Sequence, residues 1–545
     1  MPSGVAFIRG LAYGTGEPDP YPLGIMLRPP RVGGGAHRTM AQPSTWNVGY
    51  RAARLASVST ELGPLAVMAL LAAALGWTVA RSNGFGADLG SAALLTAAGL
   101  ACLAVIVAGP VACLAAIAAL TVSGVLPVLA HPGGVDITIA DVFYVGLVGW
   151  WLAGASHPVE AGLGARRRPL AFGQGLAILF LAYTGLTLLK VAGSDPGELS
   201  DAFVSWLRLV QTASLAWLAA TVIDPDRDLR PLLGAILAGA LLAIAAAAIG
   251  GGALLTQRSH GTLSSPDTLG LASGLALLIA AFGGLTPDLR YRIPVALAGL
   301  LGLVLAKSVA SFAATGFALA LGATLASPDP ARATRRISRT AFSVALASVA
   351  VFGVVRFLRP EVTPGATGFT SSSTYDRIVV GTAGLEIFER SPVIGVGWRE
   401  SNRVITDRAI NIELRRLFPN ANPIFYPDVA RTPTSVHNTY IQLLADLGLV
   451  GFSLFVALVV AIATRVRELL RRLGPRSELW PPAWVMSLGL VLVIVWLNDN
   501  PLFGGQPETV VPALLIGALA ATSRKVVANS LPVSEARGAG GACAR

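Results

Sequence analysis

His437 opens a run, His437 to Gly448, that leads directly into an apolar stretch from Leu449 to Thr464. A titratable imidazole therefore lies where a predicted transmembrane helix enters the lipid. Ionisable residues at membrane depth are energetically costly, so by default they indicate function. An imidazole accepts a proton near neutral pH, which suits it to act as a general base or to orient an acceptor hydroxyl. The alternative is an interfacial histidine whose hydrogen bonds are satisfied within the protein.

Cationic residues are predicted at the same boundary. Lys190, Arg208, Arg258, Lys307 and Arg377 all fall at or near the outer membrane face, although positive charge normally favours the cytoplasmic side. Arginine binds phosphate oxygens through two parallel hydrogen bonds and never loses its charge. Together these residues predict an anion-binding vestibule.

Each cation also has a purely structural interpretation. The two lysines can extend to the interface, Arg258 can lie in an ordinary turn, and the acid beside Arg377 can pair with another arginine. Arg208 is harder to explain in this way. It lies about two helical turns inside its predicted span, and the acid nearest to it in that segment is Asp201.

The elements that position these residues are apolar helices. The chain has 545 residues, of which 54% are hydrophobic and 13% charged, and its mean hydropathy is +0.65. Repeated apolar segments of membrane-spanning length predict an all-α, polytopic integral membrane protein with about 12–14 transmembrane helices. The predicted spans are 63–80, 88–108, 110–127, 138–157, 171–192, 203–223, 231–250, 266–285, 293–308, 310–326, 339–357, 440–463, 482–498 and 506–522. The divisions at Gly109-Pro110 and near Lys307-Ser308 are the weakest, because either pair of spans could instead be one long segment that forms a kinked or re-entrant pair.

The arginine distribution predicts the orientation. Arginine-rich loops at 166–168, 332–339 and 465–476 fall on one side of the membrane, which the positive-inside rule identifies as the cytoplasm. The resulting layout is a cytoplasmic, disordered leader (1–60), transmembrane helices (61–357), one large extracytoplasmic loop (358–439), C-terminal transmembrane helices (440–523) and a cytoplasmic tail (524–545). The protein is thus expected in the cytoplasmic membrane, with a site that faces outward.

The net charge of +11 comes mostly from arginines in short loops, so it sets orientation and does not indicate nucleic-acid binding. The three cysteines form no metal-binding or disulfide pattern. Neither H-x-x-x-H nor D-x-D occurs in a predicted outer loop. The sequence therefore predicts no metal and no cofactor.

Three segments, in this order, resemble the O-antigen ligase and polymerase superfamily of bacterial membrane glycosyltransferases. They are Arg258–Gly270, similar to R-x-x-G-T-x-x-x-P-N with Asp267 in place of Asn; Arg377 with Ser391–Gly397, similar to h-P-h-h-G-h-G; and His437–Gln442 with Gly448–Gly451, similar to H-N-x-Y-L-Q. The resemblance covers roughly residues 250–465. The basic residue that the family carries after its ninth span is represented only by Lys307.

The resemblance implies transfer of a glycan from undecaprenyl pyrophosphate to an acceptor hydroxyl, at the outer face and without metal. In that reaction Arg258 and Arg377 would stabilise the leaving pyrophosphate and His437 would act as general base. Tyr440, Asn438, Arg208 and Lys307 are the expected substrate-binding residues, although Tyr440 is equally an interfacial anchor.

The expected partners are the lipid-linked donor, a glycan, lipid or protein acceptor, and membrane lipid. The alternative is a polysaccharide or lipid transporter without catalytic activity, but the halves of the chain show no internal repeat of the kind that transporters often have. Ligase and polymerase differ only in the acceptor, so the sequence leaves both open.

Overall fold

The computed structural model describes residues 89–126, 128–130, 137–156, 173–192, 196–250, 259–263, 265–325, 372–405, 436–498 and 506–530. All of them belong to the unit Leu55–Arg545, the larger of two into which the chain divides.

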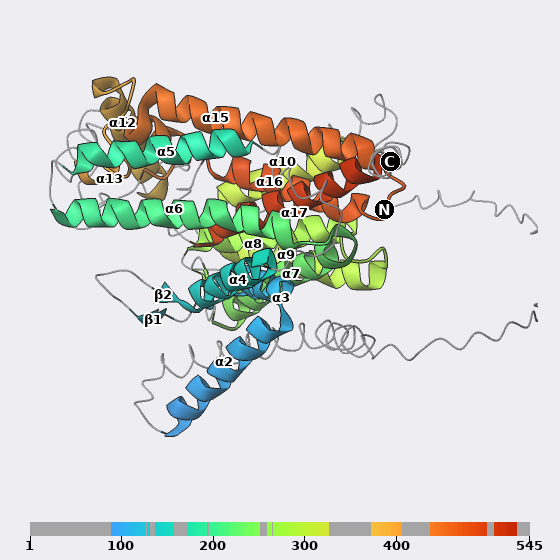
Figure 1. Cartoon of the computed structure of the whole chain (residues 1–545). Coiled ribbons are helices and arrows are strands. Elements are labelled where there is room, and N and C mark those ends of the chain that lie inside the picture. The colour runs from blue at the N-terminus through green and yellow to red at the C-terminus, as the bar shows by residue number, and fades with distance from the viewer. Residues whose placement is uncertain are drawn as a thin grey trace, which may run out of the picture. The chain divides into compact units, whose positions relative to one another are not determined.

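The described part of the chain is almost entirely helical (Figure 1). A short antiparallel pair, β1 (Val128–Ala130) and β2 (Ile137–Thr138), is its only sheet. The helices are α2 (Leu89–Ala108), α3 (Pro110–Ser123), α4 (Ile139–Ser156), α5 (Gln174–Val191), α6 (Pro196–Val222), α7 (Pro225–Gly250), α8 (Pro266–Phe282), α9 (Leu289–Ala306), α10 (Val309–Leu325), α12 (Ser372–Arg390), α13 (Ser401–Val404), α15 (Thr439–Leu473), α16 (Trp480–Trp496) and α17 (Gln506–Ser530).

The prediction of an all-α polytopic membrane protein is confirmed. Five described helices are long and apolar enough to cross a membrane: α5, α7, α9, α15 and, within α17, Glu508–Asn529. Shorter apolar helices accompany them, among them α3, α8, α10 and α16. Every predicted span that lies within the described residues coincides with a helix, whereas 63–80 and 339–357 lie outside them. The total count, the orientation and the large outer loop stay predictions.

Both doubtful divisions separate two helices. Gly109 has a φ of 118°, and Pro110 begins α3, where a proline lacks only an N–H that no helical partner would accept. Lys307 ends α9 in the left-handed region with a φ of 49°, and α10 begins two residues later. Neither pair of spans is therefore one continuous helix.

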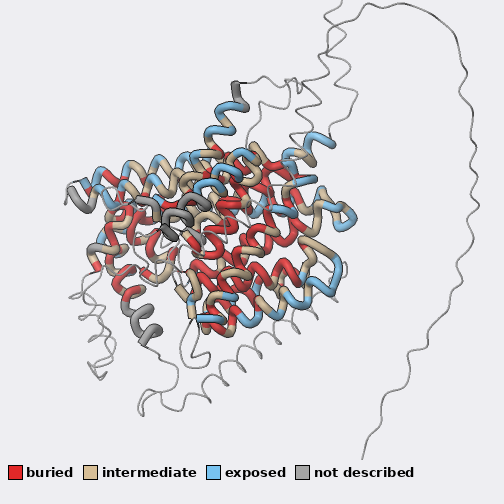
Figure 2. The backbone as a smooth tube through the Cα atoms, turned by 90° about the horizontal axis from the view of Figure 1, so that it is seen from below, coloured by how far each residue is buried: buried red, intermediate tan, exposed pale blue. Residues whose placement is uncertain are grey.

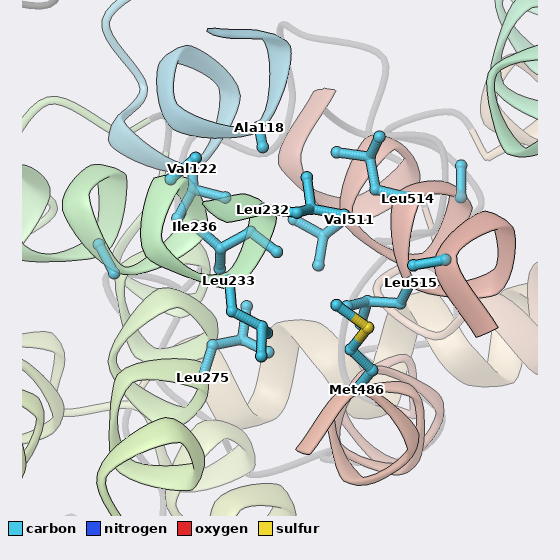
Figure 3. Close-up of a cluster of buried hydrophobic side chains, with 14 of the residues drawn as sticks. Ala118, Val122, Leu232, Leu233, Ile236, Leu275, Met486, Val511, Leu514 and Leu515 are labelled. Carbon is cyan, nitrogen blue, oxygen red and sulfur yellow. The ribbon is translucent and has the colours of Figure 1, made fainter. Parts of the chain in front are cut away.

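The core lies where α3, α7, α8, α16 and α17 meet. Apolar side chains from these helices interdigitate there (Figure 3), and buried residues concentrate inside the bundle while exposed ones line its periphery (Figure 2). Small residues let the helices approach closely, as is typical of membrane bundles. At Gly239 of α7, a Cβ would lie 2.5 Å from the carbonyl oxygen of Ala119 in α3. A side chain at this position would force the two helices apart.

A cluster of ion pairs lies at one end of the bundle. The Lys525 ammonium of α17 forms ion pairs with Asp224 and Asp226, which lie in and after the turn between α6 and α7. The arginine-rich last turns of α15 are at the same end in Figure 1. The opposite end carries His437.

Candidate functional site

The His437 turn is held by the residue that follows it. Asn438 is the N-cap of α15, and its Oδ1 accepts hydrogen bonds from the backbone N–H groups of Tyr440 (3.0 Å) and Ile441 (3.1 Å). Such a cap satisfies donors that have no partner inside the helix. The Asn438 Nδ2 donates to the carbonyl oxygen of Asn498 at 2.6 Å. The Asn438 side chain thus fixes the position of the turn that carries the half-buried His437.

The last turn of α16 joins this turn to the start of α8. The backbone N–H of Thr439 donates to the carbonyl oxygen of Leu497 at 3.1 Å. One residue earlier, the Trp496 Nε1 donates to the carbonyl oxygen of Asp267 at 3.1 Å. Asp267 is in the first turn of α8, within the Arg258–Gly270 motif. Two motifs that are far apart in the sequence are therefore connected through α16.

Two more contacts bring the starts of α17 and α10 to the start of α8. Ser265 caps α8 by accepting from the backbone N–H of Thr268 at 3.1 Å, and the Thr268 hydroxyl donates to Glu508 Oε1 at 2.8 Å. Glu508, at the start of α17, is only 5% exposed, so its carboxyl lies inside the protein. The Ser311 hydroxyl of α10 donates to the same Asp267 carbonyl at 3.0 Å.

The Arg258–Gly270 motif also contacts the end of α9, close to Lys307 in the sequence. Arg258 itself lies outside the described residues. Ser259, the next residue, donates its backbone N–H to the carbonyl oxygen of Leu305 at 3.1 Å. Leu305 is two residues before Lys307, so the start of the first motif and this lysine are at the same end of α9.

The glycine turn of the second motif fills a break in α15. Gly448 has a φ of 62° and interrupts the helix. At this break the N–H of Leu449 donates to the carbonyl of Pro392 (2.8 Å), and the N–H of Gly397 donates to the carbonyl of Asp446 (2.9 Å). Backbone groups exposed by the break thus find partners, as they must within a membrane.

Glycine is required on both sides of this contact. A Cβ at Gly448 would lie 2.5 Å from the backbone nitrogen of Gly395, and a Cβ at Gly395 would lie 2.2 Å from the carbonyl oxygen of Asp446. The two chains approach backbone to backbone. The motif glycines are therefore needed for this approach, which attaches residues 391–397 to α15.

Side chains reinforce the attachment. The Lys190 Nζ donates to the carbonyl oxygen of Gly395 at 2.6 Å, so this predicted vestibule cation holds the glycine turn. The Asp446 carboxylate, 1% exposed, accepts the backbone N–H of Ser401 at 2.9 Å. Sequence reasoning did not identify Asp446, although an acid one helical turn after Gln442 in an apolar span was a usable signal.

Arg377 lies in α12, which packs along the first turns of α15 (Figure 1). Its side chain lies outside the described residues. One turn later Val380 is fully buried together with Val436, the residue before His437. The backbone at Arg377 is therefore attached to the element that carries His437.

Arg208 has a partner that sequence reasoning missed. Its guanidinium forms a two-pronged ion pair with Asp141 of α4, with Nη2 to Oδ2 at 3.2 Å. Gln211 Nε2 and the backbone N–H of Thr138 each donate to the same carboxylate at 2.8 Å. Within its own segment the sequence offered only Asp201, and the structure supplies the partner from another helix. A phosphate would have to compete with this carboxylate for the guanidinium.

Tyr440 uses its hydroxyl internally, donating to the carbonyl oxygen of Ile494 at 2.6 Å. This bond fixes α15 against α16, so the phenol oxygen retains only acceptor capacity for a ligand. Among the described residues, no group of three or more histidine, cysteine or acidic side chains is arranged to hold a metal ion.

The comparison with protein families covers two of the three motifs, and Arg258–Gly270 lies before the matched residues. Residues 294–456 match the family model described as O-antigen ligase. The matched segment runs from α9 through α12 and the His437 turn into α15, and it includes Lys307, Arg377 and Asp446. Among curated proteins, none matches the chain. The match supports a multi-pass membrane protein of polysaccharide biosynthesis, with glycan ligase or polymerase chemistry in general.

Proposed function

We propose that the protein transfers a glycan from an undecaprenyl-pyrophosphate carrier to an acceptor hydroxyl at the outer face of the cytoplasmic membrane. The observation that carries this proposal is the connection of three motifs at one end of the bundle. The last turn of α16 joins the His437 turn to the start of α8, and the glycine turn after α12 joins α15. The O-antigen ligase match over 294–456 supports the reaction class.

The reaction needs one base and one cluster of positive charge. The acceptor oxygen attacks the anomeric carbon, its proton passes to His437, and the bond from the anomeric carbon to the phosphate oxygen breaks. The leaving lipid pyrophosphate keeps that electron pair. Arg258 and Arg377 would stabilise the growing negative charge, which fixed cations do most effectively away from bulk water. A new glycosidic bond and a free lipid pyrophosphate result, and no metal is required.

The remaining residues would bind the substrate or position the catalytic groups. Asn438 holds the His437 turn through Asn498, and Lys307 would attract the pyrophosphate from the end of α9. Tyr440 would accept a hydrogen bond from a sugar hydroxyl while it anchors α15. Arg208 would contact substrate only by exchanging Asp141 for a phosphate, so we expect it to contribute least.

The test uses purified protein, an undecaprenyl-pyrophosphate oligosaccharide and an acceptor glycan. We expect His437→Ala and Arg377→Ala to lower the transfer rate by at least about a hundredfold, the usual range for a lost base or charge stabiliser. Arg390→Ala is a matched control for Arg377→Ala, because Arg390 is exposed at the far end of the same helix, α12. Wild-type rates in both site variants would overturn the proposed roles.

The transporter alternative predicts a different product. A flippase would move intact donor across vesicles and release no lipid pyrophosphate, whereas a transferase releases one lipid pyrophosphate for each bond formed. Transfer that persists in a chelator would support metal independence, and a loss that divalent ions restore would contradict it. Glycan analysis of a deletion strain separates the acceptors: shortened chains indicate a polymerase, and lipid-bound full-length chains indicate a ligase.

A further inference from the structure

A cavity of about 1260 Å³ lies between α5, α6, α15, α16 and α17. Its walls are almost wholly apolar, with side chains such as Ile178, Trp217, Phe455, Leu458 and Val491. Small-molecule sites usually enclose about 300–1,000 Å³, so this volume exceeds the common range. The shape and lining suit hydrocarbon chains better than a compact polar ligand.

The cavity runs along α16 from Trp480 to Leu497 and along the first half of α17 (509–520), so one end of it reaches the His437 end of the bundle. It is lined by the first half of α5 (174–181), the second half of α6 (209–217), the last turns of α10 and the second half of α15 (455–471). Since α5 runs opposite to α6, α10 and α15, these named portions share the end of the bundle away from His437. The arginine-rich turns of α15 are at that end, which the positive-inside rule assigns to the cytoplasmic leaflet.

Two arginines form the polar boundary of this cavity. Arg467 and Arg471 line it, and both also line an adjoining open cavity of about 410 Å³ on the exposed surface of α15, with Thr464, Glu468 and Arg472. They are four residues apart, so they lie on one face of α15. The nearby acid, Glu468, is paired with Arg472 and lies 3.9 Å from Arg465. Among the described residues, Arg467 and Arg471 form no ion pair within 4.0 Å.

We propose that this pair of cavities binds one anionic phospholipid of the inner leaflet. The acyl chains would fill the apolar cavity, and the headgroup phosphate would lie in the smaller one, between Arg467 and Arg471. Guanidinium groups bind phosphate through paired hydrogen bonds, and basic pockets between transmembrane helices favour anionic headgroups. Trp480 and Trp484 stack at 5.2 Å beside the cavity, where aromatic rings suit the headgroup boundary.

This lipid is distinct from the proposed glycan donor. The donor's pyrophosphate is expected at the His437 end, whereas the two arginines are at the opposite end of α15. The test of the lipid site measures lipid retention and needs no transfer assay. Failure of the lipid proposal would leave the proposed glycan transfer intact, and failure of the transfer proposal would leave the lipid proposal intact.

The headgroup test is native mass spectrometry of delipidated protein after addition of phosphatidylglycerol or phosphatidylcholine. We expect wild-type protein to retain phosphatidylglycerol preferentially, and Arg467→Gln with Arg471→Gln to lower that retention about tenfold, as the loss of charge-assisted hydrogen bonds predicts. Arg465→Gln with Arg476→Gln removes the same charge from positions that line neither cavity, so it should retain the lipid. Equal retention of both lipids, or an unchanged Arg467/Arg471 variant, would overturn the proposal.

A second variant tests the acyl-chain cavity without changing charge. Ala213 lines the cavity, so Ala213→Trp should fill part of it and lower retention of phosphatidylglycerol. Ala104→Trp places the same ring on an exposed part of α2 and should have no effect. Equal retention by the two tryptophan variants would show that the lipid binds elsewhere.

Discussion

Trp496 donates its indole N–H to the carbonyl oxygen of Asp267, at 3.1 Å, across 229 positions of sequence. The same N–H lies 3.2 Å from the hydroxyl of Ser311, and Trp496 is 1% exposed. Through this one side chain, α16 fixes the first turn of α8 beside the His437 turn. The geometry of the candidate site therefore depends on a residue that belongs to none of its three motifs.

Replacing Trp496 by phenylalanine should destabilise the protein. The substitution keeps an aromatic ring and removes one of the two donors to the buried Asp267 carbonyl, while Ser311 still donates. The loss of one hydrogen bond should cost about 0.5–1.5 kcal/mol. Thermal unfolding in detergent measures the loss. Trp484→Phe is a matched control, because Trp484 is also buried but its Nε1 has no hydrogen-bond partner among the described residues. Equal losses in the two variants would show that the hydrogen bond contributes nothing.

Replacing Gly448 by alanine should disrupt the joint between α15 and residues 391–397. Its backbone (φ 62°, ψ −166°) lies in a region that only glycine adopts readily, and the new Cβ would meet Gly395 and Val393. Strain and overpacking together predict a loss of about 2–5 kcal/mol in the free energy of unfolding.

Gly474 separates the two causes of this loss. It has a similar backbone (φ 66°, ψ 158°), but a Cβ there would meet nothing within 4 Å. Gly474→Ala should therefore cost only the backbone strain, about 1–3 kcal/mol. If Gly448→Ala costs no more than Gly474→Ala, the close approach of the two chains is not the stabilising feature.

The ion pair between Asp141 and Arg208 should show strong coupling. Removing either charge leaves the other partly buried without its partner, so Asp141→Asn or Arg208→Gln should each cost about 2–4 kcal/mol. The double variant should cost less than the sum, because it leaves no isolated charge. Urea or thermal unfolding of the four proteins gives the coupling free energy.

The control for this cycle is the pair Asp226 and Lys525. The Asp226 side chain is 57% exposed and that of Lys525 27%, and exposed pairs contribute only about 0–1 kcal/mol. Coupling at Asp141–Arg208 no greater than at this pair would mean that Arg208 is free to bind a ligand, contrary to the structure.

Asn438 allows its cap to be separated from its contact with α16. Asn438→Ala loses both and should cost about 0.5–2 kcal/mol of stability. Asn438→Asp keeps an oxygen that caps α15 but loses the Nδ2 donor to Asn498. If the proposed function is correct, Asn438→Asp should fold with near-normal stability and transfer glycan more slowly. Unaltered transfer in a well-folded Asn438→Asp protein would show that this contact does not position His437.

The helices were predictable from the sequence because their signal is local. Apolar runs of membrane-spanning length predicted the described spans, and Pro266 lies near a predicted helix start, where a missing N–H costs little. The division at Gly109-Pro110 was left open by the sequence and is resolved by the structure. Charge asymmetry, however, predicts only an orientation relative to a membrane. That orientation remains a prediction.

The sequence predicted the motifs of the site and their order along the chain, but not which of its residues contact one another. The three motifs indicated which residues matter, yet nothing local revealed that Asp141 would meet Arg208 across 67 positions. Glu508 was missed for the same reason, because its burial depends on Thr268 of a distant helix. The break in α15 was hidden inside an apolar run, since a glycine there is as compatible with a continuous helix as with a left-handed residue.

The joint at Gly448 limits how this protein can move. Since peptide groups of residues 392–397 complete hydrogen bonds that α15 leaves open, pulling that turn away would strip polar backbone of its partners inside the bilayer. Any gate that admits the proposed lipid carrier must hinge elsewhere. The end of α12, the glycine turn and α15 should therefore travel together as one rigid body during turnover.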